Sequence, residues 1–236
     1  DAAEKPPSQA GKLTQTVSKT PAYRPHFIPP VMFSWERFHA VPLVGIVRGL
    51  PARQMDNLAA AYIAAGLTNL EVTLNTDGAA GIIRRLAEQY GAGLNIGAGT
   101  VLTVKDLDAA LSAGAGFVVT PVLNEDVIRQ CVAQSVPVFP GAYTPTEIYR
   151  AWLLGADMVK VFPAGQLGPG YVREVLAPLN GLRLMPTGGV TLENCTAFFE
   201  AGAQAVGLGG GLFPKHLLQA EDWAGLQRHL EAFAEK

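Results

Sequence analysis

The chain has 236 residues, of which 49% are apolar and 16% are charged, so it is long enough to bury a substantial core. Its 18 Lys and Arg residues against 20 Asp and Glu residues give a net charge of −2, which leaves no basic field to hold nucleic acid. No stretch reaches the roughly 18 uninterrupted apolar residues of a membrane span. The polar, proline-rich start also lacks the apolar run of a secretion signal. These features predict a soluble, cytoplasmic protein that binds neither nucleic acid nor a membrane.

The beginning of the chain differs from the rest. Residues 1–31 are rich in proline and show neither helical nor strand periodicity. We predict that they are an N-terminal extension, either an arm or a leader, and that residues 32–236 form one folded domain. The segment SWERFHA, residues 34–40, is expected to be a short helix that closes one end of this domain.

After residue 41, short apolar runs alternate with longer amphipathic stretches. The expected strands are PLVGIV (42–47), NLEVTL (69–74), LNIGAG (94–99), GFVVT (116–120), VPVF (136–139), DMVKVF (157–162), LRLMPT (182–187) and QAVGLG (204–209). Four of the intervening helices end on a glycine just before the next strand, where a left-handed residue turns the chain back: Gly66, Gly114, Gly155 and Gly202. Repeated strand and helix units of this length predict an α/β fold, a (β/α)8 or TIM barrel. An open doubly wound sheet usually carries a glycine fingerprint after its first strand, and this chain has RGLP there.

Two charged residues are predicted to point into the barrel. In NLEVTL the apolar alternate positions must face the helices, which turns Glu71 inward. In DMVKVF, Val159 and Val161 face outward, so Lys160 shares the inner face with Met158 and Phe162. A structural ion pair would explain both charges. The sharper interpretation is that burial lowers the Lys160 pKa and yields a neutral amine that attacks a carbonyl, with the Glu71 side chain moving protons nearby.

The carboxyl ends of the strands are where active sites form in such barrels. The predicted strands deliver polar or glycine residues there, namely Arg48, Gly99, Thr100, Thr120, Pro121, Thr187, Gly188, Gly189 and the run 207–211. Glycine-rich loops after strands seven and eight, one of them opening a helix at Thr191, are typical of a phosphate site made of backbone N–H groups. Tight turns are the alternative explanation for these glycines.

Metal and thiol chemistry have little support in the sequence. The histidines, His26, His39, His216 and His229, lie in the extension and on flanking helices, so no metal site is predicted. Cys131 and Cys195 lie far apart in helical patterns and are expected to be reduced thiols. A hydrolase of the Gly-x-Ser-x-Gly type is excluded because that motif is missing from the chain.

The sequence resembles a known family from about Pro42 to Pro214. The segments GIVRG, EVTLNT, IGAGTV, VVTP, PGAYTPTE, VKVFPA, PTGGV and GLGGGLF, in this order, are similar to those of the class I pyruvate aldolases. These enzymes cleave 2-keto-3-deoxy-6-phosphogluconate (KDPG), its galactonate epimer (KDPGal) or 4-hydroxy-2-oxoglutarate (KHG). Members are typically homotrimers that use no metal.

The resemblance implies a role for each matching residue. Lys160 would form the Schiff base and Glu71 would be the general acid and base, so that no cofactor is needed. Arg48 and Thr100 would bind the pyruvyl carboxylate, and Thr187 the substrate hydroxyls. Gly188, Gly189, Gly209 and Gly210 would bind the phosphate, and Pro121 and Phe162 complete the predicted substrate-binding set.

Three positions bear on the substrate. Arg48 with Asn75 is more like the galactonate-type enzymes, whereas Thr187 is like the gluconate type. Gly210 stands where relatives tend to carry a serine. We therefore predict cleavage of a 2-keto-3-deoxy-6-phospho sugar acid of either type to pyruvate and glyceraldehyde 3-phosphate. The alternatives are a KHG aldolase that gives pyruvate and glyoxylate, and a barrel that binds a phosphorylated ligand without turning it over.

Overall fold

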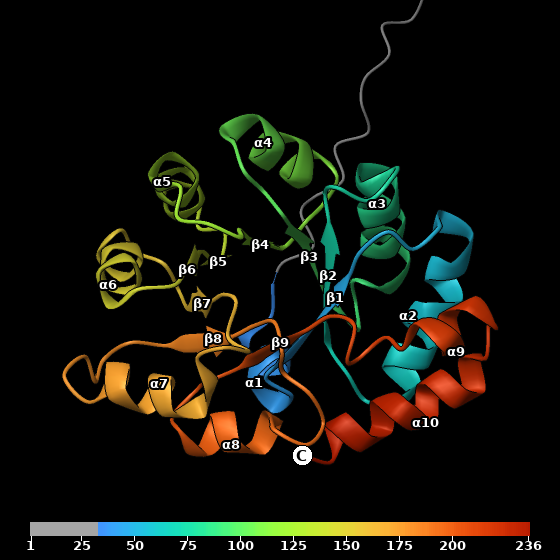
Figure 1. The fold of residues 1–236 in the computed structure, drawn as a ribbon. Coiled ribbons are helices and arrows are strands. Elements are labelled where there is room, and N and C mark those ends of the chain that lie inside the picture. The colour runs from blue at the N-terminus through green and yellow to red at the C-terminus, as the bar shows by residue number, and fades with distance from the viewer. Residues whose placement is uncertain (1–32) are drawn as a thin grey trace, which may run out of the picture.

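The computed structural model describes residues 33–236, so the predicted extension, residues 1–31, lies outside the described residues. Figure 1 shows the strands gathered at the centre of the molecule with the helices around their outside. The alternation of strand and helix predicted from the sequence is confirmed along the chain. No helix within residues 33–236 has both the length and the apolar character needed to cross a membrane.

All the strand pairs are parallel, and they form two sheets. The six-stranded sheet has the order β5-β4-β3-β2-β1-β9 and the three-stranded sheet the order β6-β7-β8. The strands are β1 Leu43–Val47, β2 Asn69–Thr73, β3 Asn95–Gly99, β4 Phe117–Val119, β5 Val138–Phe139, β6 Gly141–Ala142, β7 Val159–Val161, β8 Leu184–Pro186 and β9 Val206–Leu208.

The helices follow the strands along the chain. Their bounds are α1 Trp35–Ala40, α2 Met55–Ala64 after the 3-10 turn η1 Ala52–Gln54, α3 Ala79–Tyr90, α4 Val104–Ser112, α5 Glu125–Ala133, α6 Pro145–Leu153, α7 Gly168–Leu176, α8 Cys195–Glu200, α9 Lys215–Gln219 and α10 Trp223–Ala234. Two of them open with capping boxes, in which Thr103 and Thr144 accept a hydrogen bond from the third helical N–H.

The glycines predicted to end four helices do so in left-handed conformations. Gly66, Gly114, Gly155 and Gly202 have φ angles of 80°, 94°, 96° and 103°. The prediction of a helix opening at Thr191 is wrong, because α8 begins at Cys195 after a turn.

The division into two sheets has a local cause in the predicted fifth strand. Pro140 separates β5 from β6 and has no N–H to add to a ladder. Its carbonyl still accepts a hydrogen bond from the Lys160 N–H at 2.9 Å. At the other junction, Thr187 and Gly207 form an isolated parallel bridge, and the Gln204 N–H donates to the Leu184 carbonyl at 3.0 Å. The structure therefore shows an α/β fold with curled parallel sheets.

The two faces of the strands carry different side chains. Leu70, Val72, Val159 and Val161 belong to the large apolar cluster between strands and helices, as the strand alternation predicts. A second, smaller cluster fills the inner side and consists of Phe38, Val44, Ile46, Phe117, Val119, Phe139, Met158, Met185 and Ala205.

Helix α1 covers the N-terminal end of this inner cluster. Phe38 is fully buried in it, and Phe33 and Trp35 pack against it. Phe33 lies edge-on to Phe117 with ring centroids 5.5 Å apart. The Asn95 amide also donates to the Ser34 carbonyl at 2.9 Å. These contacts fix the short helix predicted at residues 34–40 across one end of the strands.

Candidate active site

Two charged side chains are buried on the inner face. Glu71, at the centre of β2, is 1% exposed, and Lys160, at the centre of β7, is 5% exposed. Among residues 33–236, neither of them is in an ion pair within 4 Å, and the Glu71 Oε2 atom has no hydrogen-bond partner. Buried charges that only stabilise a fold are normally paired and hydrogen-bonded. This arrangement does not match a closed structural ion pair.

Burial changes the acidity of both groups. Removal from water raises the pKa of the Glu71 carboxyl, against the lowering effect of the positive Lys160 and Arg48 side chains. Removal from water also lowers the pKa of the Lys160 ammonium, against the negative charge of Glu71 and together with the positive charge of Arg48. Lys160 therefore reaches its neutral, nucleophilic form at a lower pH than an exposed lysine.

Space for the Glu71 carboxyl comes from the neighbouring strand. An added Cβ at Gly99, the last residue of β3, would collide with Glu71 Oε1. The next residue, Thr100, has a φ of 57°, in the left-handed region that side chains rarely adopt. Such conformations gather at functional sites, where surrounding structure holds them. Gly99 thus lies beside the carboxyl, and Thr100 follows it at the end of β3, where the sequence placed both residues.

Two further predicted residues lie close to the lysine strand. The Phe162 ring centroid is 4.9 Å from Lys160 Nζ. Pro121 follows β4, and an added Cβ at Gly141, the strand neighbour of Lys160, would meet the Pro121 backbone. The Thr120 hydroxyl accepts a hydrogen bond from the Gly141 N–H at 3.2 Å, which fixes this corner.

The predicted Thr187 lies after β8 and is 3% exposed. Its hydroxyl donates to the Met185 carbonyl at 3.2 Å. Gly207 provides the room, because a Cβ there would collide with the Thr187 hydroxyl.

The loop that follows Thr187 begins with two glycines, so it presents backbone groups rather than side chains. Gly188 and Gly189 have φ angles of 83° and 80°. A Cβ on Gly189 would press on the Gly165 backbone, and the Asn194 amide donates to the Gly189 carbonyl at 2.9 Å. Sequence reasoning missed Gly165 and Asn194, although the Gly in FPAG and an Asn three residues after Thr191 were visible signals.

The second glycine loop follows β9. The Gly209 carbonyl accepts hydrogen bonds from the N–H groups of Leu212 and Phe213, both at 3.0 Å, which closes one turn. The His229 ring Nε2 lies 2.8 Å from the Gly211 carbonyl, so α10 supports the loop. No atom lies within 4 Å of a Cβ built on Gly210.

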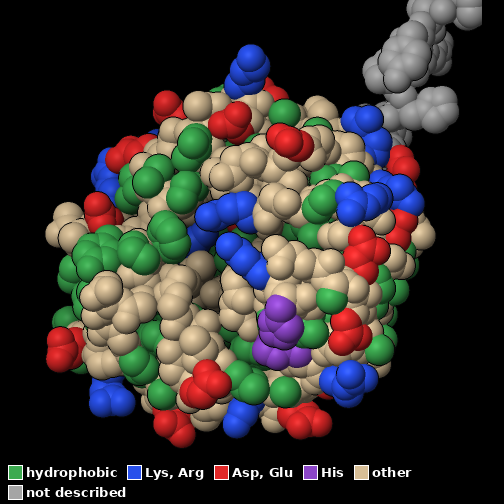
Figure 2. All heavy atoms as spheres, turned by 45° about the vertical axis from the view of Figure 1, so that its right-hand side comes forward, with side chains coloured by type: hydrophobic (Ala, Val, Ile, Leu, Met, Phe, Trp, Pro, Cys, Tyr) green, Lys and Arg blue, Asp and Glu red, His purple; other side chains and the backbone are tan. Residues whose placement is uncertain are grey.

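Arg48 lies after β1 and is exposed, and its charge acts on both buried groups. On the face drawn in Figure 2, acidic and basic side chains are interspersed, and Lys and Arg side chains border a hollow near its centre. Because the strands are parallel, the residues that follow them lie at the same edge of the sheets. These residues are Arg48, Thr100, Pro121, Phe162 and the two glycine loops. The structure thus brings the predicted residues to the carboxyl ends of the strands.

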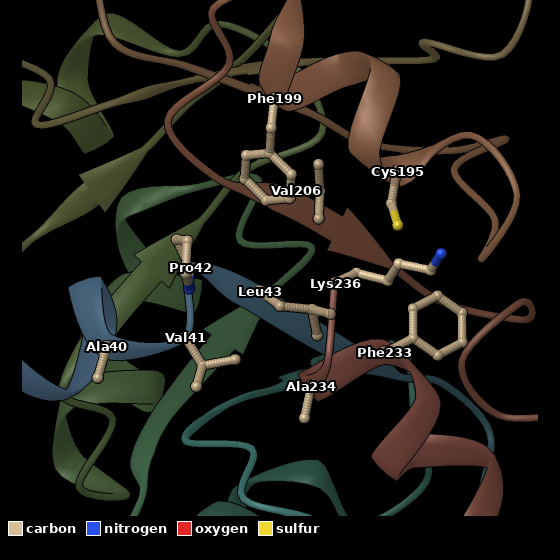
Figure 3. Close-up of a pocket in the computed structure, with 10 residues that line it drawn as sticks. All are labelled: Ala40, Val41, Pro42, Leu43, Cys195, Phe199, Val206, Phe233, Ala234 and Lys236. Atoms are coloured by element: carbon tan, nitrogen blue, oxygen red, sulfur yellow. The ribbon is translucent and has the colours of Figure 1, made fainter.

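A separate cavity lies near the opposite end of the strands. It has a volume of about 110 Å³ and is lined mainly by apolar side chains, which include Leu43, Cys195, Val206 and Phe233 (Figure 3). Cys195 and Cys131 are free, buried thiols. Within residues 33–236, no group of three or more His, Cys, Asp or Glu side chains could hold a metal ion.

Comparison with known proteins places these features in context. Residues 35–229 match the family model described as KDPG and KHG aldolase. The chain is 35% identical to the 2-dehydro-3-deoxy-6-phosphogalactonate aldolase of Escherichia coli, over 73% of this chain and 85% of that protein. It is 39% identical to the 2-dehydro-3-deoxy-phosphogluconate aldolase of Pseudomonas aeruginosa, over 75% of this chain and 83% of that protein. A solved structure of native KDPGal aligns with a TM-score of 0.78 and 31% identity, covering 86% of this chain and 96% of that one.

Proposed function

We propose that this chain, which belongs to the KDPG and KHG aldolase family, cleaves a 2-keto-3-deoxy-6-phospho sugar acid to pyruvate and glyceraldehyde 3-phosphate. The observation that carries the proposal is the buried pair Lys160 and Glu71, two opposite charges with no ion pair between them. An amine and a carboxyl held in this way can act on the same part of a substrate: the amine can bond to the ketone carbon while the carboxyl transfers protons next to it.

The reaction begins with the neutral Lys160 amine, which attacks the ketone carbon of the substrate. The carbinolamine loses its hydroxyl as water when Glu71 donates a proton, which leaves a protonated imine. Glu71, now ionised, takes the proton of the C4 hydroxyl as the C3–C4 bond breaks. The bonding electrons move into the imine to give an enamine, and glyceraldehyde 3-phosphate is released.

The second half of the reaction regenerates the enzyme. Glu71 returns its proton to the enamine carbon, which becomes the methyl group of pyruvate. Water then adds to the protonated imine and gives a proton to Glu71, and the resulting carbinolamine breaks down to pyruvate and the free Lys160 amine. Glu71 therefore donates two protons and takes up two in each cycle, so a carboxyl with a raised pKa suits both directions of transfer.

The two ends of the substrate are anionic, and the site offers a different type of group to each. We assign the pyruvyl carboxylate to Arg48 and the Thr100 hydroxyl, and the C4 and C5 hydroxyls to Thr187. We assign the phosphate to the backbone N–H groups of the two glycine loops, at Gly188, Gly189, Gly209 and Gly210. Pro121 and Phe162 form walls beside the imine.

We also infer that the two sheets belong to one closed (β/α)8 barrel, in which β5 and β6 count as a single strand. The short gap at Pro140 and the Thr187–Gly207 bridge support this. A homotrimer is our proposal for the assembly. Exposed apolar side chains on neighbouring loops and helices, such as Leu102, Val122, Tyr143 and Leu153, support a buried interface. The molar mass by light scattering tests it, and a cytoplasmic location stays a prediction.

The imine is tested by adding pyruvate and borohydride and mapping the reduced adduct by peptide mass spectrometry. We expect the adduct on Lys160. Lys105→Arg, which removes a lysine at the start of α4, is the control and should be trapped as readily as wild type. An adduct on another lysine contradicts the assignment of the imine to Lys160. The absence of any adduct contradicts the mechanism and favours a barrel that binds its ligand without reaction.

The substrate is tested by measuring pyruvate release from KDPG, from KDPGal and from 4-hydroxy-2-oxoglutarate. A phosphorylated compound should have the highest kcat/KM. A preference for 4-hydroxy-2-oxoglutarate would make this chain a KHG aldolase that forms glyoxylate, and the phosphate assignment would be wrong.

A further inference from the structure

Two buried threonines connect the strand of Glu71 to the turn of Arg48. Thr73, the last residue of β2, and Thr76, in the turn after it, are 0% and 5% exposed. Their hydroxyl oxygens lie 3.2 Å apart. The Thr76 hydroxyl accepts a hydrogen bond from the Gly49 N–H at 3.0 Å, and the Thr73 hydroxyl donates to the Val47 carbonyl at 3.3 Å.

The donors and acceptors can be ordered in only one direction. The Gly49 N–H can only donate a hydrogen bond and the Val47 carbonyl can only accept one. Each hydroxyl between them must therefore accept one hydrogen bond and donate the next. The Thr76 proton points to the Thr73 oxygen, and the Thr73 proton points to the Val47 oxygen. The two hydroxyls therefore form a bridge between the peptide groups on either side of Arg48.

This bridge, formed by Thr73 and Thr76, lies where β1 ends. Gly49 has a φ of 67° and no Cβ, so the residue itself restricts the backbone after Arg48 less than any other residue type would. The Thr76 N–H also donates to the Thr73 carbonyl at 2.9 Å, so the turn carrying the hydroxyls is itself fixed. Arg48 is exposed, and no ion pair within residues 33–236 holds its guanidinium.

We propose that Thr73 and Thr76 are positioning residues, whose hydroxyl bridge aims Arg48 at the carboxylate of a 2-keto acid held on Lys160. The inference rests on the proposed function, because it needs Arg48 to bind that carboxylate. A guanidinium binds a carboxylate best when both are held in one plane, so fixing the Arg48 backbone reduces the freedom lost on binding. The same strand then places Glu71 and, through the bridge, orients Arg48.

The test uses Thr76→Val, which keeps the shape of the side chain and removes the hydroxyl. We expect the pyruvate concentration for half-maximal trapping to rise about tenfold, or about 1.4 kcal/mol. The trapping rate at saturating pyruvate should change by less than about twofold, because neither Lys160 nor Glu71 is altered. Thr76→Ser, which keeps the hydroxyl, should restore most of the affinity. Thr73→Val should behave like Thr76→Val and serves in its place if that variant does not fold.

The matched control is Thr68→Val, at the residue that directly precedes β2. The Thr68 hydroxyl donates to the Arg37 carbonyl at 2.9 Å, so this variant also loses a hydrogen bond between a threonine hydroxyl and the backbone, at the end of the strand away from the site. It should lower Tm without changing the pyruvate concentration for half-maximal trapping. Equal effects of Thr68→Val and Thr76→Val on pyruvate affinity would mean that Thr76 only supports the fold.

A double-mutant cycle with Arg48→Ala decides whether the threonine acts through the arginine. If it does, Thr76→Val has little further effect on pyruvate affinity once Arg48 is removed. Additive effects of the two substitutions, with wild type trapped normally, overturn the positioning role and leave the proposed function in place. A wild-type protein that pyruvate does not trap overturns both.

Discussion

The proposed carboxylate end and the proposed phosphate end of the site are made from different parts of the chain. Around β1, β2 and β3 the proposed functional groups are side chains, Glu71 above all, which lie on or directly after strands of five buried residues. Around β8 and β9 they are backbone groups in glycine loops that follow strands of three residues. The function of the carboxylate end therefore depends on side-chain identity, and that of the phosphate end depends on backbone conformation.

This difference follows from the charge that each end must handle. Burial raises the pKa of the proposed proton carrier, Glu71, and the buried strand β2 holds its side chain in place. A phosphate arrives fully charged and needs several donors at once, which the N–H groups of a tight turn provide without any change in protonation. Variants that alter one end should therefore leave the other end working.

The largest expected effect is at the carboxylate end. Glu71→Gln keeps the size of the side chain and removes the proton carrier, so kcat should fall by about 10² to 10⁴. Pyruvate should still be trapped on Lys160, and KM for the phosphorylated substrate should change little. Measured kcat, KM and Tm check this. An unchanged kcat would mean that another group carries the proton, and an unfolded variant would favour a structural role for Glu71.

A smaller but selective loss is expected at the phosphate end. Gly189→Val puts a side chain on a residue with a φ of 80°, where its Cβ presses on Gly165. A strain of about 1–3 kcal/mol predicts that kcat/KM for the phosphorylated substrate falls about 5- to 150-fold. Pyruvate trapping should stay near the wild-type level.

Gly66→Val is the matched control for Gly189→Val. Gly66 has the same φ of 80°, with no atom within 4 Å of an added Cβ, and it lies at the end of α2 away from the loops. It should lower Tm and leave the kinetics of both substrates unchanged. If both valine variants lost activity on phosphorylated and unphosphorylated substrates alike, the backbone assignment would be wrong.

The pH dependence separates the two ends more finely. The rate of pyruvate trapping should rise with pH as the Lys160 amine becomes neutral, with a midpoint below the pKa of an ordinary lysine, because burial lowers the Lys160 pKa. The negative charge of Glu71 raises that pKa, so Glu71→Gln should move the midpoint to lower pH. Gly189→Val should not move it. A midpoint at the ordinary lysine value would contradict the burial argument.

The smallest expected effect is a gain. Gly210→Ser adds a hydroxyl where an added Cβ meets no other atom. A new hydrogen bond to a charged phosphate is worth about 1 kcal/mol, so kcat/KM for the phosphorylated substrate should rise up to about fivefold. Activity on 4-hydroxy-2-oxoglutarate serves as the internal control and should stay constant. A loss on both substrates would show that the loop needs glycine at 210 for its own conformation.

Sequence alone predicted that Glu71 and Lys160 point inward, because alternation along one strand determines which way a side chain points. The four glycines that end helices were predicted from a different signal, a glycine repeated just before a strand. Sequence alone missed the bridge of Thr73 and Thr76, because that contact depends on the register between β1 and β2, which no pattern within one strand encodes. The interruption at Pro140 and the turn before α8 at Cys195 were also missed, although Pro140 has no N–H to add to a ladder.

The position of helix α1 affects the route by which ligands enter and leave the site. Because, among residues 33–236, Phe33, Trp35 and Phe38 cover the N-terminal side of the inner cluster, we expect molecules to approach Lys160 from the edge that carries Arg48 and the glycine loops. The substrate then enters, and both products leave, at the same edge of the strands. The aldehyde must leave first, since pyruvate is still bonded to the enzyme, and a high aldehyde concentration should oppose the exit of the first product more than that of the second.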